Sequence, residues 1–193
     1  IFDAQALDHY PAVNPDDTWA LACEALTDDA EYLPRLLDLS DLSPLDASSV
    51  LAALDNDSST LEGPPLLLGD ITAGADLGRW ARTQVTKAPN GSQHWLRRHD
   101  VRVWINRLWI ARPEQLAQLI RPAHSVGWHW RGQWHQTQIP AVNTSGARLG
   151  WSLEQWQAIQ SIGVINRVLA EIGEPTAQDL PAVARQIVQA DAE

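Results

Sequence analysis

The chain has 193 residues, 45% of them hydrophobic, which is enough for one packed domain or for a domain with a small appended lobe. Its single cysteine, Cys23, excludes an internal disulfide framework and any zinc site built from several cysteines. No stretch approaches the roughly 18 apolar residues of a membrane span, and the N-terminus shows no secretion signal, so we expect a cytoplasmic protein.

The formal net charge of -10 is spread unevenly along the chain. Residues 1–78 hold sixteen acids and one base, residues 79–148 hold eleven bases and two acids, and residues 149–193 hold six acids and two bases. The basic middle therefore either binds an acidic partner or folds back on the acidic N-terminal half. Internal pairing has the advantage that opposite charges on one compact chain meet without a cost of association.

The first third of the chain predicts few regular elements, because clusters of Asp, Ser and Pro interrupt its apolar stretches. A helix is predicted around Val50–Leu54, and the candidates for its N-cap are Asp46, Ser48 and Ser49. Leu66–Leu68, bounded by prolines and a glycine, predicts a short buried strand. The spacing of apolar residues predicts a helix over about 75–85.

Clearer signals begin at Asn90-Gly91, a turn dipeptide that leads into a predicted strand over 93–98. Asp100 stands where an N-cap belongs, and apolar residues follow from Val101 to Trp109 at the spacing of one helix face. The next predicted helix has Pro113 in its first turn and ends before Pro122.

Tryptophans that alternate with other residues predict a β-hairpin over 125–139. Beyond it, Ser152 and Gln155 form a capping box at the start of a helix expected to reach Gly173, and Trp151 and Trp156 occupy the positions of a hydrophobic staple.

A last amphipathic helix is expected over about 180–190. The predicted fold is α+β, with a small mixed or antiparallel sheet packed against helices and a helical C-terminal end. We expect a domain over residues 1–148 and a helical lobe over residues 149–193.

The segment from His94 to Trp134 resembles a known family. It reads Trp-Leu-Arg-Arg-His-Asp-Val-Arg-Val-Trp from residue 95, then Pro-Glu-Gln-Leu-Ala-Gln-Leu-Ile-Arg-Pro from residue 113, then Trp-His-Trp-Arg-Gly-Gln-Trp from residue 128. This pattern resembles the type VI secretion effector adaptor or chaperone family, known as domain-of-unknown-function family 4123. Val101 stands where that family usually has proline, and Arg121 where it usually has glycine, so the junction before the helix is less rigid.

The resemblance implies a cytoplasmic protein that binds a toxin effector and helps to load it onto the valine-glycine repeat spike protein (VgrG) of a type VI secretion system. It implies no catalysis and no cofactor. Tryptophan and arginine dominate interface energetics, so the candidate partner-binding residues are Arg97, Arg98, Asp100, Arg102, Trp128, Trp130 and Trp134. The alternative is local: Asp100 caps its helix and pairs with Arg98 or Arg102, and the tryptophans pack in the core.

The same segment offers residues for two other functions. A nucleic-acid-binding module would stack bases on its aromatic residues and contact phosphates through its arginines, but the net charge and the lack of a recognised motif count against it. An enzyme would draw on Asp100 and five histidines, but the sequence has no HExxH spacing, Gly-x-Ser-x-Gly elbow or Gly-rich phosphate loop. The histidines concerned are His94, His99, His124, His129 and His135. We therefore expect a non-enzymatic protein without a metal site.

Overall fold

The computed structural model describes residues 18–20, 35–57, 67–69, 85–95, 97, 100–121, 123–130, 132–139, 150–173, 175–176 and 178–191. Within these ranges, the strands are β1 (Thr18–Ala20), β2 (Arg35–Leu37), β3 (Leu67–Gly69), β4 (Val85–Lys87), β5 (Gln93–Trp95), β6 (Ser125–Trp130) and β7 (Gln133–Gln138). The helices are α1 (Pro44–Asp57), α3 (Val101–Ile110), α4 (Pro113–Ile120), α5 (Leu153–Gln160), α6 (Ile162–Ile172) and α7 (Leu180–Asp191). The predicted α+β class is confirmed, and the small sheet is antiparallel.

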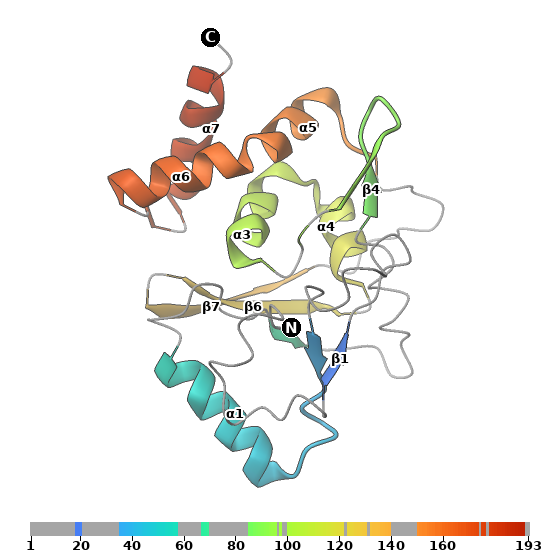
Figure 1. Cartoon of the computed structure of the whole chain (residues 1–193), viewed down its shortest axis with the longest axis vertical. Helices are drawn as coiled ribbons and strands as arrows, with labels where there is room; N and C mark the ends of the chain where they lie inside the picture. Colours follow the sequence, from blue (N-terminus) through green and yellow to red (C-terminus); the bar gives the residue numbers. More distant parts are fainter. Residues whose placement is uncertain are drawn as a thin grey trace.

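The main sheet has the order β3-β6-β7, and helices cover both of its sides (Figure 1). The predicted hairpin over 125–139 is confirmed as β6 and β7, joined by a turn in which Gly132 has a φ of 74°. Side chains alternate between the two faces of a strand, so Trp128 and Trp130 of β6 point to the side opposite His129. α3 lies over the tryptophan side, and α1 lies on the other side.

Two hydrophobic clusters occupy these two sides of the sheet. The larger one joins α3, α4, the tryptophan face of β6 and the C-terminal helices, and it includes Trp104, Trp128, Trp156, Ile165 and Ala184. The smaller one packs Val50 and Leu54 of α1 near Leu67 and Trp134. Helices α5 to α7 thus share a core with the rest of the chain, and the division at residue 149 stays a prediction.

α1 begins earlier than the sequence predicted, and its cap differs from the three candidates. Ser43 accepts a hydrogen bond from the backbone N–H of Asp46 at 3.2 Å, and its hydroxyl donates to the Asp46 carboxylate at 2.6 Å. Pro44 then occupies the first helical position, where its missing N–H costs nothing. The prediction of Asp46, Ser48 or Ser49 as N-cap was wrong because Ser43-Pro44 supplies an earlier start.

The Asn90-Gly91 turn is confirmed between β4 and β5. The Asn90 side chain accepts a hydrogen bond from the backbone N–H of Ser92 at 3.0 Å, and Gly91 has a φ of 85°. Val85, the expected end of a helix over 75–85, instead starts β4, and residues 75–84 lie outside the described ranges. Of the strand predicted over 93–98, residues 93–95 form β5, Arg97 lies in no regular element, and residues 96 and 98 lie outside the described ranges.

The predicted helix from residue 153 to Gly173 is divided at Ser161 into α5 and α6. The Ser161 hydroxyl donates to the carbonyl of Gln157 at 3.1 Å, a bond that competes with the helical ladder. Gly173 ends α6 with a φ of 87°. No helix in the described ranges is long and apolar enough to cross a bilayer.

Two capping boxes are joined where α4 meets α5. The Gln115 side chain accepts from the backbone N–H of Arg112 at 2.8 Å, and that of Gln155 accepts from the backbone N–H of Ser152 at 3.1 Å. The Gln155 amide also donates to the side-chain oxygen of Gln115 at 2.9 Å and to the carbonyl of Ile110 at 2.8 Å. These bonds fix the start of α5 against the end of α3.

Candidate partner-binding groove

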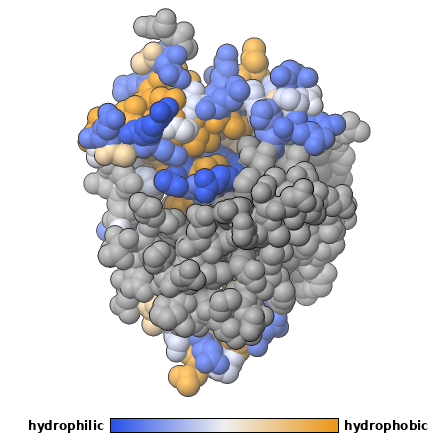
Figure 2. Space-filling view, in the orientation of Figure 1, coloured by the Kyte–Doolittle hydropathy of each residue, from blue (hydrophilic) through white to orange (hydrophobic). Residues whose placement is uncertain are grey.

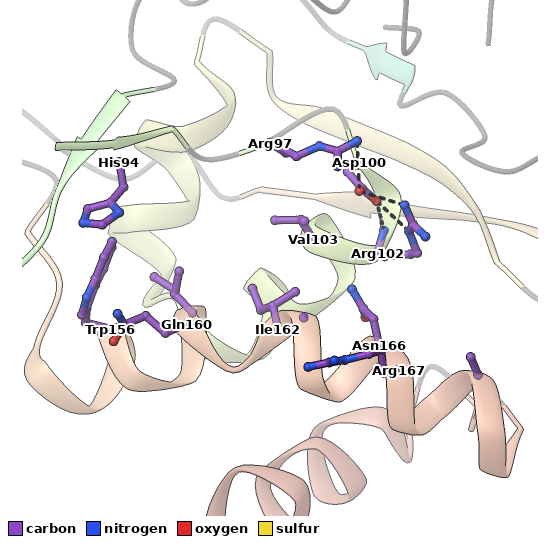
Figure 3. A pocket seen from close by; sticks show the side chains of 13 residues that line it. His94, Arg97, Asp100, Arg102, Val103, Trp156, Gln160, Ile162, Asn166 and Arg167 are labelled. Carbon is purple, nitrogen blue, oxygen red and sulfur yellow. Dashed lines mark hydrogen bonds and ion pairs between the residues drawn. The ribbon is translucent and has the colours of Figure 1, made fainter. Parts of the chain in front are cut away.

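An open groove of about 610 Å³ lies between the N-terminal end of α3 and the bent pair α5 and α6 (Figure 3). Its floor is apolar and includes Val103, Ile159 and Ile162. On this end of the molecule, apolar side chains reach the surface between hydrophilic ones (Figure 2). The groove is therefore an apolar depression within a polar rim.

One wall of the groove is an arginine corner, made of Arg97, Asp100 and Arg102. Asp100 caps α3 by accepting the backbone N–H of Arg102 at 3.0 Å, which confirms the predicted N-cap. The Arg102 guanidinium donates to both carboxylate oxygens at 3.2 Å, and a guanidinium nitrogen of Arg97 lies 3.7 Å from Asp100 Oδ2. One carboxylate thus orients two guanidinium groups.

Exposure differs sharply within this corner. The Asp100 side chain is 8% exposed, whereas those of Arg97 and Arg102 are 48% and 54% exposed. An incoming group therefore meets the guanidinium groups before it meets the carboxylate. The predicted local pairing of Asp100 with Arg102 is confirmed, and Arg98 lies outside the described residues.

The opposite wall comes from α6, where Gly163, Arg167 and Ala170 follow at i, i+4 and i+7 and so share one helix face. Arg167 is exposed and makes no hydrogen bond or ion pair with the part of the chain that the structure describes. A Cβ atom added at Gly163 would meet nothing within 4 Å. This face of α6 thus carries a positive charge at Arg167 and leaves unoccupied space at Gly163.

His94 and Trp156 close one end of the groove, with ring centroids 4.8 Å apart (Figure 3). The hydroxyl of Ser92 lies 2.8 Å from Nε2 of His94. Toward the other end, the side-chain amides of Asn106 and Asn166 meet at 3.4 Å and link α3 to α6. These contacts set the spacing of the two walls.

The hairpin tryptophans do not join this groove. Trp128 and Trp130 are 5% and 6% exposed and lie in the larger cluster, and Trp134 is half-buried near Val50 and Leu54. The indole N–H groups of Trp104 and Trp128 have no hydrogen-bond partner within the described ranges. In the isolated chain, Trp128 and Trp130 are not available to a partner's surface, and the predicted contact through them stays without support.

Among the described histidines that favoured an enzyme, only His129 and His135 are neighbours, on the paired strands β6 and β7. His94 lies at the groove, His124 is exposed elsewhere, and His99 lies outside the described residues. Burial lowers the pKa of His129, opposed by a backbone hydrogen bond with Gly132 and by Asp55, while nearby His135 lowers it further. No group of three or more His, Cys, Asp or Glu residues that could hold a metal occurs within the described ranges.

The sequence predicted residues of one wall of the groove, Arg97, Asp100 and Arg102, but none of the other wall. Gly163 and Arg167 lie about 70 residues beyond Arg97, and no motif links them. A usable signal was the polar and small face of α6, opposite the stripe that buries Ile165 and Leu169. No protein-family model, curated protein or solved structure matches this chain.

Proposed function

We propose that the protein is a non-enzymatic adaptor that binds a toxin effector and helps to load it onto the VgrG spike of a type VI secretion system. One observation carries the proposal. The groove is lined by the residues at the centre of the resemblance, Arg97, Asp100 and Arg102, and the two arginine side chains are exposed. Exposed arginines beside apolar surface are typical of protein interfaces.

The shape of the groove supports a macromolecular partner. It is partly open to solvent, and its described walls come from α3, α5 and α6 with His94 at one end. Small-molecule sites bury most of their ligand in a closed concavity, whereas a shallow groove between helices suits a segment of another protein.

The test is co-purification of the tagged full-length chain with the effector encoded beside its gene and with VgrG. Retention of the effector at a defined stoichiometry, measured by light scattering of the complex, is the expected result. The control bait is the variant Arg97→Glu with Arg102→Glu. It should retain at most a tenth of the effector, because a carboxylate then replaces each exposed guanidinium group of this wall. A wild-type chain that retains neither protein would overturn the proposal.

A further inference from the structure

We infer that the groove between α3 and α6 binds an acidic amphipathic helix of the cargo, with its apolar stripe on the floor and its carboxylates on the arginines of the two walls. This inference rests on the proposed adaptor function and names the kind of segment that is bound. It is carried by the lining of the groove and by the charges on its rim.

The rim selects for acidic groups. Arg97 and Arg102 stand on one wall and Arg167 on the other, whereas Asp100 is the only acidic residue among the described residues that line the groove. Because Asp100 is 8% exposed and contacts two guanidinium groups, its charge is screened from the groove. A carboxylate entering from solvent therefore meets cations on either side.

The floor selects for an apolar stripe. Val103 of α3, Ile159 of α5 and Ile162 of α6 line it, and Trp156 closes one end. Gly163 leaves open space above the floor, since a Cβ atom there would contact nothing within 4 Å. A volume of about 610 Å³ accommodates several large apolar side chains, as presented by successive turns of an amphipathic helix.

The backbone groups of the groove walls favour a partner that binds as a helix over one that binds as an added strand. An added strand needs a row of unpaired backbone N–H and C=O groups at a sheet edge. The described groove walls are mostly helices, whose interior backbone groups are already hydrogen-bonded to each other, and His94 is the only described lining residue that comes from a strand. The partner must therefore be held by side chains, which is how a helix docks in a groove.

Position 163 provides the sharpest test, because its three replacements separate volume from charge. Gly163→Ala adds one methyl group and should bind effector as wild type does. Gly163→Leu fills the floor, and Gly163→Glu adds a carboxylate to the same volume. We expect each to weaken binding of the full-length effector about tenfold or more, with the larger loss for Glu, as measured by biolayer interferometry.

Charge reversal on the rim has a matched control. Arg167→Glu should weaken effector binding about tenfold, and the loss should shrink as the salt concentration rises. Arg112→Glu makes the same change in net charge at an exposed site outside the groove, at the start of α4, and should leave binding unchanged. Overlapping peptides tiled from the effector should bind only where they form an acidic amphipathic helix.

Three other outcomes of these binding experiments would each lead to a different conclusion. A wild-type chain that retains no effector overturns the proposed function and this inference together. Effector bound equally by wild type, Gly163→Glu and Arg167→Glu overturns the inference alone and leaves the adaptor function standing. Binding of a single-stranded DNA oligonucleotide that is lost in these two variants, while effector binding persists, would instead assign the groove to nucleic acid.

The acidic N-terminal half of the same chain is the competing occupant. If it fills the groove, Gly163→Glu would lower the thermal midpoint of the isolated protein by several degrees relative to Gly163→Ala, and the inference would be overturned. If the groove accepts a partner, the two variants should unfold within about 2 °C of each other, a small difference for a chain of this size.

Discussion

Asp100 combines two contacts in one carboxylate: it caps α3 through the N–H of Arg102, and it orients the guanidinium groups of Arg97 and Arg102. The same side chain therefore affects the stability of a core helix and the shape of the groove wall. An isosteric substitution separates these two roles, because an amide oxygen accepts the capping hydrogen bond but carries no charge.

Asp100→Ala should lower the free energy of unfolding by about 1 to 2 kcal/mol, the range for a lost N-cap, as measured by urea denaturation. Asp100→Asn should cost less, since its side chain still caps the helix, but should weaken effector binding by loosening the two arginines. Equal losses of stability in both variants would show that the ion pairs, rather than the cap, hold α3.

Substitution of glycine by alanine should have opposite effects on the free energy of unfolding at Gly163 and at Gly132. Gly163→Ala should raise the free energy of unfolding by about 0.5 to 1 kcal/mol, because the site is helical, exposed and unobstructed. Gly132→Ala should lower it, because that residue has a φ of 74° in the hairpin turn. Thermal unfolding of both variants measures this, and stabilisation by Gly132→Ala would contradict the turn geometry.

His129 makes stability depend on pH. Its pKa is lowered, chiefly by burial, so the unfolded chain takes up a proton before the folded one does as the pH falls. The contribution of the neutral imidazole is present above the ordinary pKa of about 6.5 and is lost as the pH falls through the lowered value.

Urea midpoints measured from about pH 7.5 to 5 should therefore fall more steeply for wild type than for His129→Gln. Equal slopes for the two proteins would mean that His129 does not govern the acid side of the stability profile.

The stability of the junction between α4 and α5 depends on the hydrogen bonds between Gln115 and Gln155. Removing one of them leaves the polar group of the other without its partner, and Gln115 is buried. Gln155→Ala should cost about 1 to 3 kcal/mol in urea denaturation, whereas Gln157→Ala, exposed on the same helix, should stay within about 0.5 kcal/mol of wild type.

A double-mutant cycle of Gln115→Ala and Gln155→Ala tests the link itself. Because the two side chains are in contact, we expect a coupling energy of about 1 kcal/mol or more. Additive losses would instead mean that each glutamine only completes the cap of its own helix.

Local signals predicted the helices well. Asp100, Pro113 and the pair Ser152 and Gln155 each act through groups within three residues, so the sequence alone identified where α3, α4 and α5 begin, although not Arg112 as the N-cap of α4. The groove has no such signal, because Arg97 and Arg167 line the same groove only after α6 packs on α3. Trp128 and Trp130 were equally ambiguous, since an alternating strand does not reveal that both of its faces are covered.

At the scale of the whole molecule, the packing of the larger hydrophobic cluster depends on the C-terminal helices. α5, α6 and α7 share a hydrophobic cluster with α3 and the sheet, so a chain of residues 1–148 would expose Trp104, Ile105 and Trp128 to water. We expect this truncated chain to lack the sharp near-ultraviolet circular dichroism of packed tryptophans. A cooperative thermal transition in it would instead establish residues 149–193 as a separate lobe.

The covering of β6 on both faces also restricts how the hairpin can pair. Shifting β6 by one residue against β7 would turn Trp128 and Trp130 toward α1 and expose His129 to the larger cluster. A Cβ atom added at Gly127 would contact Leu67 at 3.5 Å, so this part of the α1 side is already packed. A shift of register is thus opposed on both faces of β6 at once, which favours the observed pairing.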